Sequence, residues 1–259
     1  MAKISDVASL AGVSTAAVSR ILSGDAKLRV TDETRERVLA AARELQYVPN
    51  NAARSLRTSR TRTIALVVPD VTSAVYSELA RGAEDEAAAR GYALVLGRAE
   101  HLEGDSEWLR RLVAEGRVDG VILQLPDGAL ASNLDTLAAG STPIVVINSI
   151  DDGSHSTIVL DDAAGIRSAV DHLRSLGHTE IGYVGGATNS YTGLRRRAAY
   201  LAAMAEAGFP VRQSWMTALG YSGQNGRAAV GELLAAGLLP TALVVANLNA
   251  ALGVLAEIH

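Results

Sequence analysis

The first residues carry two short runs of apolar positions at helical spacing. In ISDVASLAGVSTAAVSRIL, residues 4–22, the runs lie on either side of Gly12, and each has the period of an amphipathic helix. Gly12 supplies the permissive backbone that a tight turn needs, and the hydroxyl of Ser14 is suited to cap the second helix. The pattern predicts two short helices at a steep angle, as in a helix-turn-helix.

The second of these helices has an outer face of small and polar residues. It begins after Ser14, and Thr15, Ala16, Ser19 and Arg20 lie on that face. A recognition helix meets base edges in the major groove with such a face. The four residues on this face and the preceding Ser14 are therefore the predicted DNA contacts of the helix-turn-helix. An ordinary helical hairpin with a solvated Arg20 is the alternative for this segment alone.

A third helix is predicted from the capping sequence TDET at residues 31–34 through Leu45. Apolar residues recur on one of its faces, and they would close a three-helix core.

The segment NNAARSLRTSRTRT, residues 50–63, is rich in arginine and has Leu56 as its lone large apolar residue. It is too short and polar to be stable alone. We expect it to become a helix on DNA, where phosphates neutralise the arginines and Leu56 inserts between base steps in the minor groove. A plain basic linker is the alternative. The predicted DNA contacts of this hinge are Asn50, Ala53, Arg54, Leu56 and Arg57.

From Thr63 onwards, short and almost wholly apolar runs alternate with stretches of helical pattern. Such runs are typical of parallel strands buried on both faces by helices, in a repeating βα unit. The strands are expected at residues 64–68, 92–96, 120–124, 143–148, 181–184, 215–219 and 242–246. The helices are expected near residues 74–90, 105–116, 130–139, 163–176, 193–207 and 223–236.

A polar stretch, IDDGSHSTI at residues 150–158, interrupts this alternation and suits a crossing between two subdomains. We therefore predict an N-terminal all-α helix-turn-helix headpiece and an α/β core of two Rossmann-like subdomains. The alternative is a core made of one large Rossmann-like domain. Open parallel sheets bind ligands beyond the carboxyl ends of their strands, so two facing lobes would enclose one cavity. The predicted boundaries are 1–49 for the headpiece, 50–62 for the hinge and 63–259 for the core, with subdomains of about 63–153 and 154–259.

Composition narrows the class of protein. With 259 residues, 48% of them hydrophobic, the chain can bury substantial cores in two or three domains. It has no cysteine, which excludes disulfides and thiolate metal sites and permits a reducing compartment. No apolar run approaches the roughly 20 residues of a membrane span. We expect a cytoplasmic protein without a membrane partner.

The net charge of −4 conceals an asymmetry. Residues 1–62 hold 11 Lys or Arg and 6 Asp or Glu, a balance of +5, whereas the remainder holds 13 basic and 22 acidic residues, a balance of −9. Binding to a polyanion depends on the local field of the surface that docks. The basic end is therefore expected to bind DNA.

Enzyme chemistry finds little support in the sequence. The glycine pair at 185–186 lacks the spacing of a phosphate-binding loop, and the five histidines show no metal-ligand spacing. We expect no catalytic residue, no cofactor and no metal. A Rossmann-like enzyme is one alternative function. A sugar-binding protein without a role on DNA is another, but it leaves the first 62 residues unused.

The sequences KISDVASLAGVSTAAVSRILSG and TRERVLAAARELQYVPNNAARSLRT resemble the headpiece and hinge of the LacI/GalR family of bacterial transcriptional repressors. This headpiece motif is highly specific. The resemblance covers nearly the whole chain through weaker motifs that occur in the family's order, namely IALVVPD, GVILQLP, PIVVINS, DDAAGIRSAVDHLRSLGHTEIGYVGG, RRRAAY and VVANLNAALG. It implies a core similar to periplasmic sugar-binding proteins.

Short polar residues stand at the expected strand ends and at the start of the second lobe, where they could fix hydroxyls or amides of an effector. They are Asp70, Gln124, Asn148, Asp161 and Asn247. Capping of the following helix is the equal alternative for Asp70, Asp161 and Asn247, because Asp and Asn commonly take that role.

The resemblance identifies Arg196, in TGLRRRAAY, with the family arginine that clamps a sugar hydroxyl or carboxylate, a partner suited to a guanidinium. Arg195 and Arg197 are expected to be solvated. Tyr76 and Trp215 are candidates for an apolar wall against a sugar ring, with burial in the core as the alternative.

The implied function is a transcriptional regulator, a repressor in the first instance, that binds a pseudo-palindromic operator as a homodimer under allosteric control by a sugar or sugar derivative. Whether the effector releases or promotes DNA binding stays open. Two departures from the family pattern bear on this. Family members commonly have Asn-Asp after the final strand, whereas this chain has Asn247-Leu248 and so lacks the carboxylate. The chain also ends at His259, earlier than family members do, so we expect a C-terminally truncated core.

Overall fold

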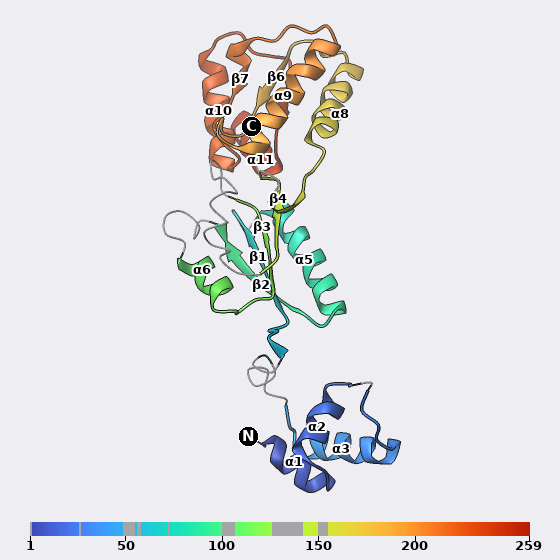
Figure 1. The fold of residues 1–259 in the computed structure, drawn as a ribbon. Helices are drawn as coiled ribbons and strands as arrows, with labels where there is room; N and C mark the ends of the chain where they lie inside the picture. Colours follow the sequence, from blue (N-terminus) through green and yellow to red (C-terminus); the bar gives the residue numbers. More distant parts are fainter. Residues whose placement is uncertain are drawn as a thin grey trace. The chain divides into compact units, whose positions relative to one another are not determined.

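The chain divides into two compact units, residues 1–61 and residues 62–259. A computed structural model, drawn in Figure 1, shows the helices and strands of each unit. It describes residues 2–25, 27–48, 55, 58–71, 73–99, 107–125, 142–149 and 155–259.

The first unit is a three-helix core, as predicted. Its helices are α1 (Ile4–Ala11), α2 (Thr15–Leu22) and α3 (Asp32–Glu44). Val7, Val18 and Val38, one from each helix, are fully buried. Because each helix brings an apolar stripe to one shared centre, three short helices that are marginal alone become stable together.

Capping fixes where these helices begin and end. The Ser14 hydroxyl accepts a hydrogen bond from the N–H of Ala17 at 3.2 Å, and the Thr31 hydroxyl accepts one from the N–H of Thr34 at 3.2 Å. Between α1 and α2, Gly12 has a left-handed φ of 66°. The predicted caps and the glycine turn are confirmed.

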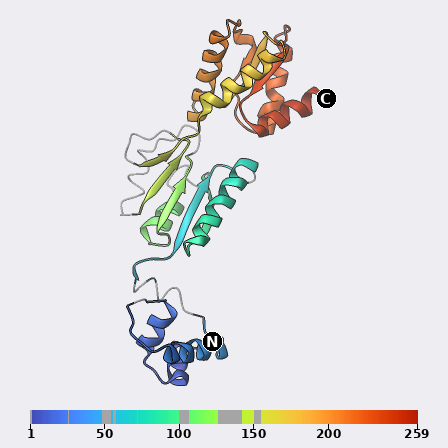
Figure 2. The ribbon, with the colours of Figure 1, turned by 90° about the vertical axis from the view of Figure 1, so that its right-hand side faces the viewer.

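The second unit contains two parallel sheets. The first has the order β2-β1-β3-β4-β5. Its strands are β1 (Thr63–Val68), β2 (Ala93–Arg98), β3 (Gly120–Leu123), β4 (Ile144–Ile147) and β5 (Ser156–Ile158). Helices α5 (Ala74–Ala89) and α6 (Glu107–Ala114) lie on opposite sides of these strands (Figures 1 and 2).

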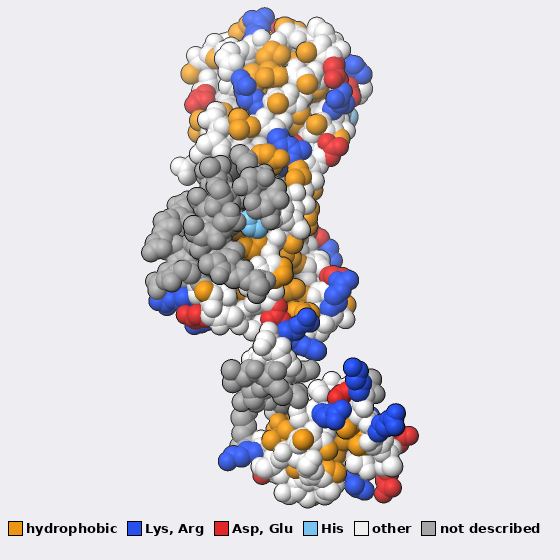
Figure 3. Space-filling model, viewed as in Figure 1, with side chains coloured by type: hydrophobic (Ala, Val, Ile, Leu, Met, Phe, Trp, Pro, Cys, Tyr) orange, Lys and Arg blue, Asp and Glu red, His pale blue; other side chains and the backbone are white. Residues whose placement is uncertain are grey.

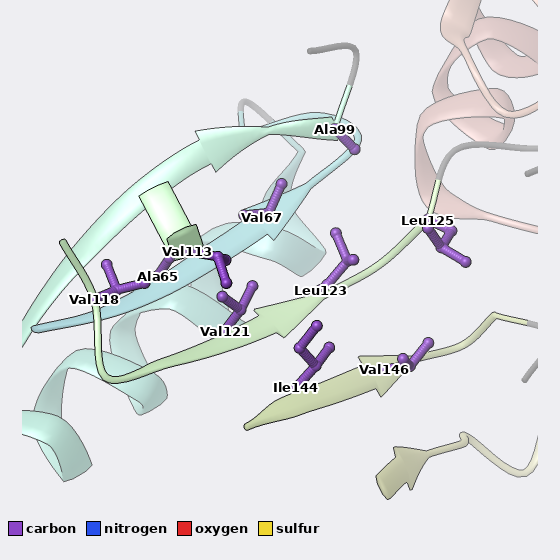
Figure 4. Packing of buried hydrophobic residues seen from close by; sticks show 10 residues of the cluster. All are labelled: Ala65, Val67, Ala99, Val113, Val118, Val121, Leu123, Leu125, Ile144 and Val146. Atoms are coloured by element: carbon purple, nitrogen blue, oxygen red, sulfur yellow. The ribbon is translucent and has the colours of Figure 1, made fainter. Parts of the chain in front are cut away.

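The core of the first sheet follows from the two-residue period of its strands. Alternate residues of β1, β3 and β4 point to the same face, where Val113 of α6 joins them (Figure 4). The buried strand residues of this cluster are Ala65, Val67, Val121, Leu123, Ile144 and Val146.

The edges of the first sheet depart from the expectation of strands buried on both faces. Val95 and Leu96 of β2 are 40% and 52% exposed. The reason is position, since β2 is an edge strand and β1 is its only partner among the described strands. Strand β5, which was not predicted, is exposed along its length and pairs with β4. It lies beyond the subdomain boundary expected near residue 153, yet it belongs to the first sheet.

The second sheet has the order β7-β6-β8, with β6 (Ile181–Val184), β7 (Met216–Thr217) and β8 (Ala242–Val245). Helices α8 (Asp162–Ser175) and α9 (Tyr191–Glu206) pack with Ile181 and Tyr183 of β6. Helices α10 (Gly223–Ala235) and α11 (Leu248–Ile258) pack with Val184 of the same strand. The alternation of side chains along β6 therefore supplies both cores.

Each of the predicted strands is present in the described part of the chain. The helix expected near 130–139 lies outside the described residues, and α11 was not predicted. No helix among the described residues is long and apolar enough to cross a lipid bilayer.

Glycines allow α10 and α11 to meet backbone to backbone. A Cβ at Gly253 would collide with the carbonyl of Gly223, and one at Gly226 would collide with the carbonyl of Ala250. Backbone atoms cannot move aside as a flexible side chain can, so glycine at these two positions is what allows this close contact.

We predict that Gly253→Ala destabilises residues 62–259 by about 1–3 kcal/mol, because the added methyl overpacks this contact. Gly231→Ala is the matched control. Gly231 lies in α10 with no atom within 4 Å of a Cβ built there, so alanine should stabilise by about 0.5–1 kcal/mol through helix propensity. Urea unfolding of both variants checks this, and equal stabilities would contradict the close contact.

Candidate functional site

Helix α2, the predicted recognition helix, displays the expected face of small and polar residues. Thr15 and Ala16 are exposed, Ser19 and Arg20 are half-buried, and Ser14 is the N-cap. On the face seen in Figure 3, Lys and Arg side chains are scattered over residues 1–61 with fewer acidic ones. The five hinge positions predicted to touch DNA, Asn50, Ala53, Arg54, Leu56 and Arg57, lie outside the described residues.

A second polar site is built at the carboxyl end of the second sheet, around Arg196. Its Nε donates to Oδ1 of Asp162 at 2.8 Å, and one terminal nitrogen donates to the carbonyl of Ala246, just after β8, at 2.8 Å. Asp162 is 6% exposed. Burial works against the charge of Arg196, but the hydrogen bond to Asp162 and nearby charges raise its pKa above the ordinary value.

Tyr221 forms one wall of this site. Its ring lies 5.5 Å from the guanidinium carbon of Arg196, and its hydroxyl accepts a hydrogen bond from Thr192 at 3.1 Å. Thr192 in turn bonds to the buried Ser190. A Cβ at Gly186 would collide with the Tyr221 ring, so glycine after β6 makes room for it.

We call the part of the core around the first sheet the first lobe and the part around the second sheet the second lobe. Three buried polar atoms of the second lobe have no hydrogen-bond partner among the described residues. They are Oδ2 of Asp162, the hydroxyl of Tyr183 and the hydroxyl of Thr217. Burial raises the pKa of Tyr183 above its ordinary value, so this hydroxyl keeps its proton. Buried polar atoms are normally paired, and unpaired ones mark places where a polar ligand would gain most.

Two of the predicted effector residues of this lobe act as helix caps, which is the alternative left open for them. Oδ1 of Asp161 accepts from the N–H of Ala164 at 3.0 Å, and Oδ1 of Asn247 accepts from that of Ala250 at 2.8 Å. Asn247 also donates to the carbonyl of Tyr221 at 3.0 Å. It thereby holds the backbone of the residue that walls the site.

The structure contradicts the assignment of Trp215 to a sugar-stacking wall. Its side chain is fully buried and packs with Val230 and Leu233 of α10. Its indole nitrogen donates to the carbonyl of Leu238, and the guanidinium of Arg212 covers its ring at 4.7 Å. The ring therefore belongs to the core, and the pattern of the sequence could not distinguish the two placements.

The predicted effector residues of the first lobe follow strands of the first sheet. Asp70 follows β1, Gln124 follows β3 and Asn148 follows β4. All three are half-buried, as is Tyr76 in the first turn of α5. Asn148 has a left-handed φ of 44°, and its Oδ1 accepts from the N–H of Leu160 at 3.0 Å.

Arg195 was expected to be solvated, but it contacts Leu160 and Asp162. A terminal nitrogen donates to the carbonyl of Leu160 at 3.1 Å, and its Nε lies 3.8 Å from Oδ2 of Asp162. The backbone of Leu160 is thus held at its N–H by Asn148 and at its C=O by Arg195.

Sequence reasoning missed Asp162, Thr192 and Tyr221. Thr192 had a usable signal, because it precedes Arg196 by four residues and so shares its face of α9. Asp162 and Tyr221 had none, since a first-turn acid and a loop tyrosine are common. Within the described ranges, no group of three His, Asp or Glu side chains is placed to hold a metal ion.

Comparison with known proteins identifies both units. Residues 3–50 match the family of bacterial regulatory proteins, lacI family, and residues 61–258 match the periplasmic binding proteins and sugar binding domain of the LacI family. The HTH-type transcriptional repressor PurR of Erwinia tasmaniensis is 35% identical over 249 residues, which are 94% of this chain and 71% of that protein. Catabolite control protein A of Priestia megaterium is 31% identical over 97% of this chain and 76% of its own.

Solved structures agree. The crystal structure of the lac repressor dimer bound to operator and the anti-inducer ONPF has a TM-score of 0.83 at 26% identity, covering 99% of this chain and 77% of that chain. A LacI family transcriptional regulator from Mycobacterium smegmatis is 34% identical with a TM-score of 0.66, over 75% of this chain and 71% of its own. The chain belongs to the LacI family of bacterial regulatory proteins and is a DNA-binding transcriptional regulator, not an enzyme.

Proposed function

We propose that this protein represses transcription in the cytoplasm by binding a pseudo-palindromic operator as a homodimer, and that a sugar or sugar derivative in its core controls that binding. One observation carries the proposal. The same chain combines an exposed recognition helix with an ion pair between the half-buried Arg196 and the buried Asp162, where Oδ2 of the carboxylate has no hydrogen-bond partner among the described residues. A DNA-binding helix and a polar ligand site in one chain are the two distinct sites that a ligand-controlled regulator needs.

On DNA, α2 enters the major groove, and Arg20 is the long side chain that reaches base edges. Thr15, Ala16 and Ser19 are short, so they allow close approach and add little direct readout. The hinge residues, with Leu56 at the minor groove, complete the contact, and DNA deformability then supplies much of the specificity.

We predict that Arg20→Ala weakens binding by about 1–3 kcal/mol on a duplex selected from a randomised pool by the unaltered protein, and that it relaxes preference at one position of each half-site. Fluorescence anisotropy on the selected and on single-base-altered duplexes measures both. Arg167→Ala, in the other unit, should leave them unchanged. A complete lack of salt-dependent binding to any duplex would sink the DNA-binding role.

In the core, the site at the end of the second sheet suits a small polyhydroxylated ligand. Arg196 donates, Asp162 accepts, and the half-buried Tyr221 offers a ring. Sugars match this combination because they present adjacent hydroxyls with an apolar face. Asp70, Gln124 and Asn148, at strand ends of the first sheet, are the contacts proposed for the other lobe.

A thermal-shift screen of sugars, sugar acids and nucleosides on the intact protein should find a ligand that raises the melting temperature. Arg196→Lys should then weaken that ligand about tenfold or more, because an ammonium cannot bond Asp162, Ala246 and a ligand with a planar fork. Arg167→Lys, an exposed arginine paired with Glu206, is the control. Equal affinity in the two variants would place the ligand elsewhere.

Dimerisation is supported by an apolar stripe on α11. Leu248, Leu252, Leu255 and Ile258 are 51–60% exposed and recur at helical spacing. A row of exposed large apolar side chains on one helix marks an interface, and a second copy with the same row would cover it. The lac repressor structure cited above is itself of a dimer on its operator.

Leu252→Glu should therefore shift the protein to monomer in sedimentation velocity, because a charge would be buried at the interface. Binding to a two-half-site duplex should weaken in parallel. Leu176→Glu alters a leucine that is 62% exposed at the end of α8 and should leave the sedimentation coefficient unchanged. If both variants remain dimeric, the stripe on α11 is not the interface.

A further inference from the structure

The loop that ends α2 fixes Asp25 beside Arg20. Gly24 has a left-handed φ of 67°, its N–H donates to the carbonyl of Ile21, and the N–H of Asp25 donates to the carbonyl of Arg20, each at 3.1 Å. These two hydrogen bonds form a Schellman closure, which glycine at the left-handed position favours. The backbone thus returns Asp25 to the last turn of the recognition helix.

The side chains complete this arrangement. Nε of Arg20 donates to Oδ2 of Asp25 at 2.8 Å, while the backbone N–H of Lys27 donates to Oδ1 at 2.9 Å. The carboxylate is therefore held from two directions and cannot turn away from the guanidinium. Hydrogen bonds from Arg20 and then from Lys27 keep the pKa of Asp25 below its ordinary value, so it is charged at neutral pH.

This contact leaves the end of the guanidinium available. Of its five N–H groups, the single one on Nε is taken, and the terminal nitrogens make no hydrogen bond to a residue that the structure describes. The Arg20 side chain remains 43% exposed. Guanine presents two acceptors, O6 and N7, to just such a pair of donors. A guanidinium whose plane is already fixed loses less rotamer freedom when it binds them.

The carboxylate also changes what Arg20 attracts. An isolated arginine binds any phosphate, and this charge term dominates non-specific affinity. With an anion at 2.8 Å, the pair of Arg20 and Asp25 carries no net charge, whereas the directed N–H groups of the guanidinium remain. The pair therefore favours a base edge over the phosphate backbone.

We propose that Asp25 is a positioning residue for operator recognition, which holds the guanidinium of Arg20 toward a guanine and reduces its attraction to phosphates. This inference rests on the proposed role of Arg20 in reading DNA, and it adds a specificity device that acts through Arg20 without touching a base.

The test uses the full chain with Asp25→Asn, which keeps the size of the side chain and one oxygen for Lys27 but removes the charge and the second acceptor. Glu36→Gln is the matched control, since it removes one negative charge from the same unit at an exposed pair with Arg43. Affinities are measured for a duplex selected from a randomised pool and for a scrambled duplex of the same composition.

For Asp25→Asn, the ratio of the two affinities should fall about tenfold, and the affinity for the scrambled duplex should rise about twofold. For Glu36→Gln, both affinities should rise together, so the ratio stays constant. In an Arg20→Ala background, adding Asp25→Asn should change the ratio no further, because Asp25 acts through Arg20.

An unchanged ratio in Asp25→Asn, or an equal additional loss in the Arg20→Ala background, overturns the proposal while leaving DNA binding intact. A lack of preference for any duplex by the unaltered protein removes the proposed function as well. If Asp25→Asn unfolds the first unit, NMR on the unaltered protein tests the contact between Arg20 and Asp25 instead. The Nε–H of Arg20 should exchange with solvent at least tenfold more slowly than that of the exposed Arg29, and equal rates would refute the contact.

Discussion

A positive charge that is largely withdrawn from water needs a neutralising partner beside it, and the second lobe is organised by this constraint at the half-buried Arg196. Its guanidinium bonds a carboxylate at the start of α8 and a carbonyl at the end of β8, and it lies near the ring of Tyr221. Three segments far apart in the sequence are thus held at one end of the sheet. Removing Asp162 would take the carboxylate away from this guanidinium, so the candidate ligand site and the stability of the lobe depend on the same contact.

Most of the fold could be predicted from the sequence, because its determinants are periodic. Apolar runs gave the strands of both sheets, and Gly12 and Ser14 gave the helix-turn-helix. Edge strands were harder, since β2 is as apolar as a central strand and only the strand order shows that it is exposed. Strand β5 was not predicted, because its three residues are all exposed and show no alternation of apolar and polar positions.

The candidate site was less predictable, for a physical reason. A side chain's role depends on which way it points, and spacing alone does not determine this for Trp215, which is buried, or for Asp161 and Asn247, which cap helices. Arg196 could be recognised by resemblance, whereas the pairing of Asp162 with it is visible only in the structure. The ion pair between Arg20 and Asp25 likewise depends on a chain reversal at Gly24 that brings residues five apart together.

The two hydrogen bonds to the backbone of Leu160 restrict movement between the two lobes. Its N–H is held by Asn148, which follows a strand of the first sheet, and its C=O by Arg195 of the second lobe. Torsion in the chain at this point weakens both hydrogen bonds, because each depends on the angle between donor and acceptor. A rotation of one lobe against the other at this crossing would therefore have to break or replace one of these hydrogen bonds, and Arg195 is the sequence neighbour of the residue proposed to bind the effector.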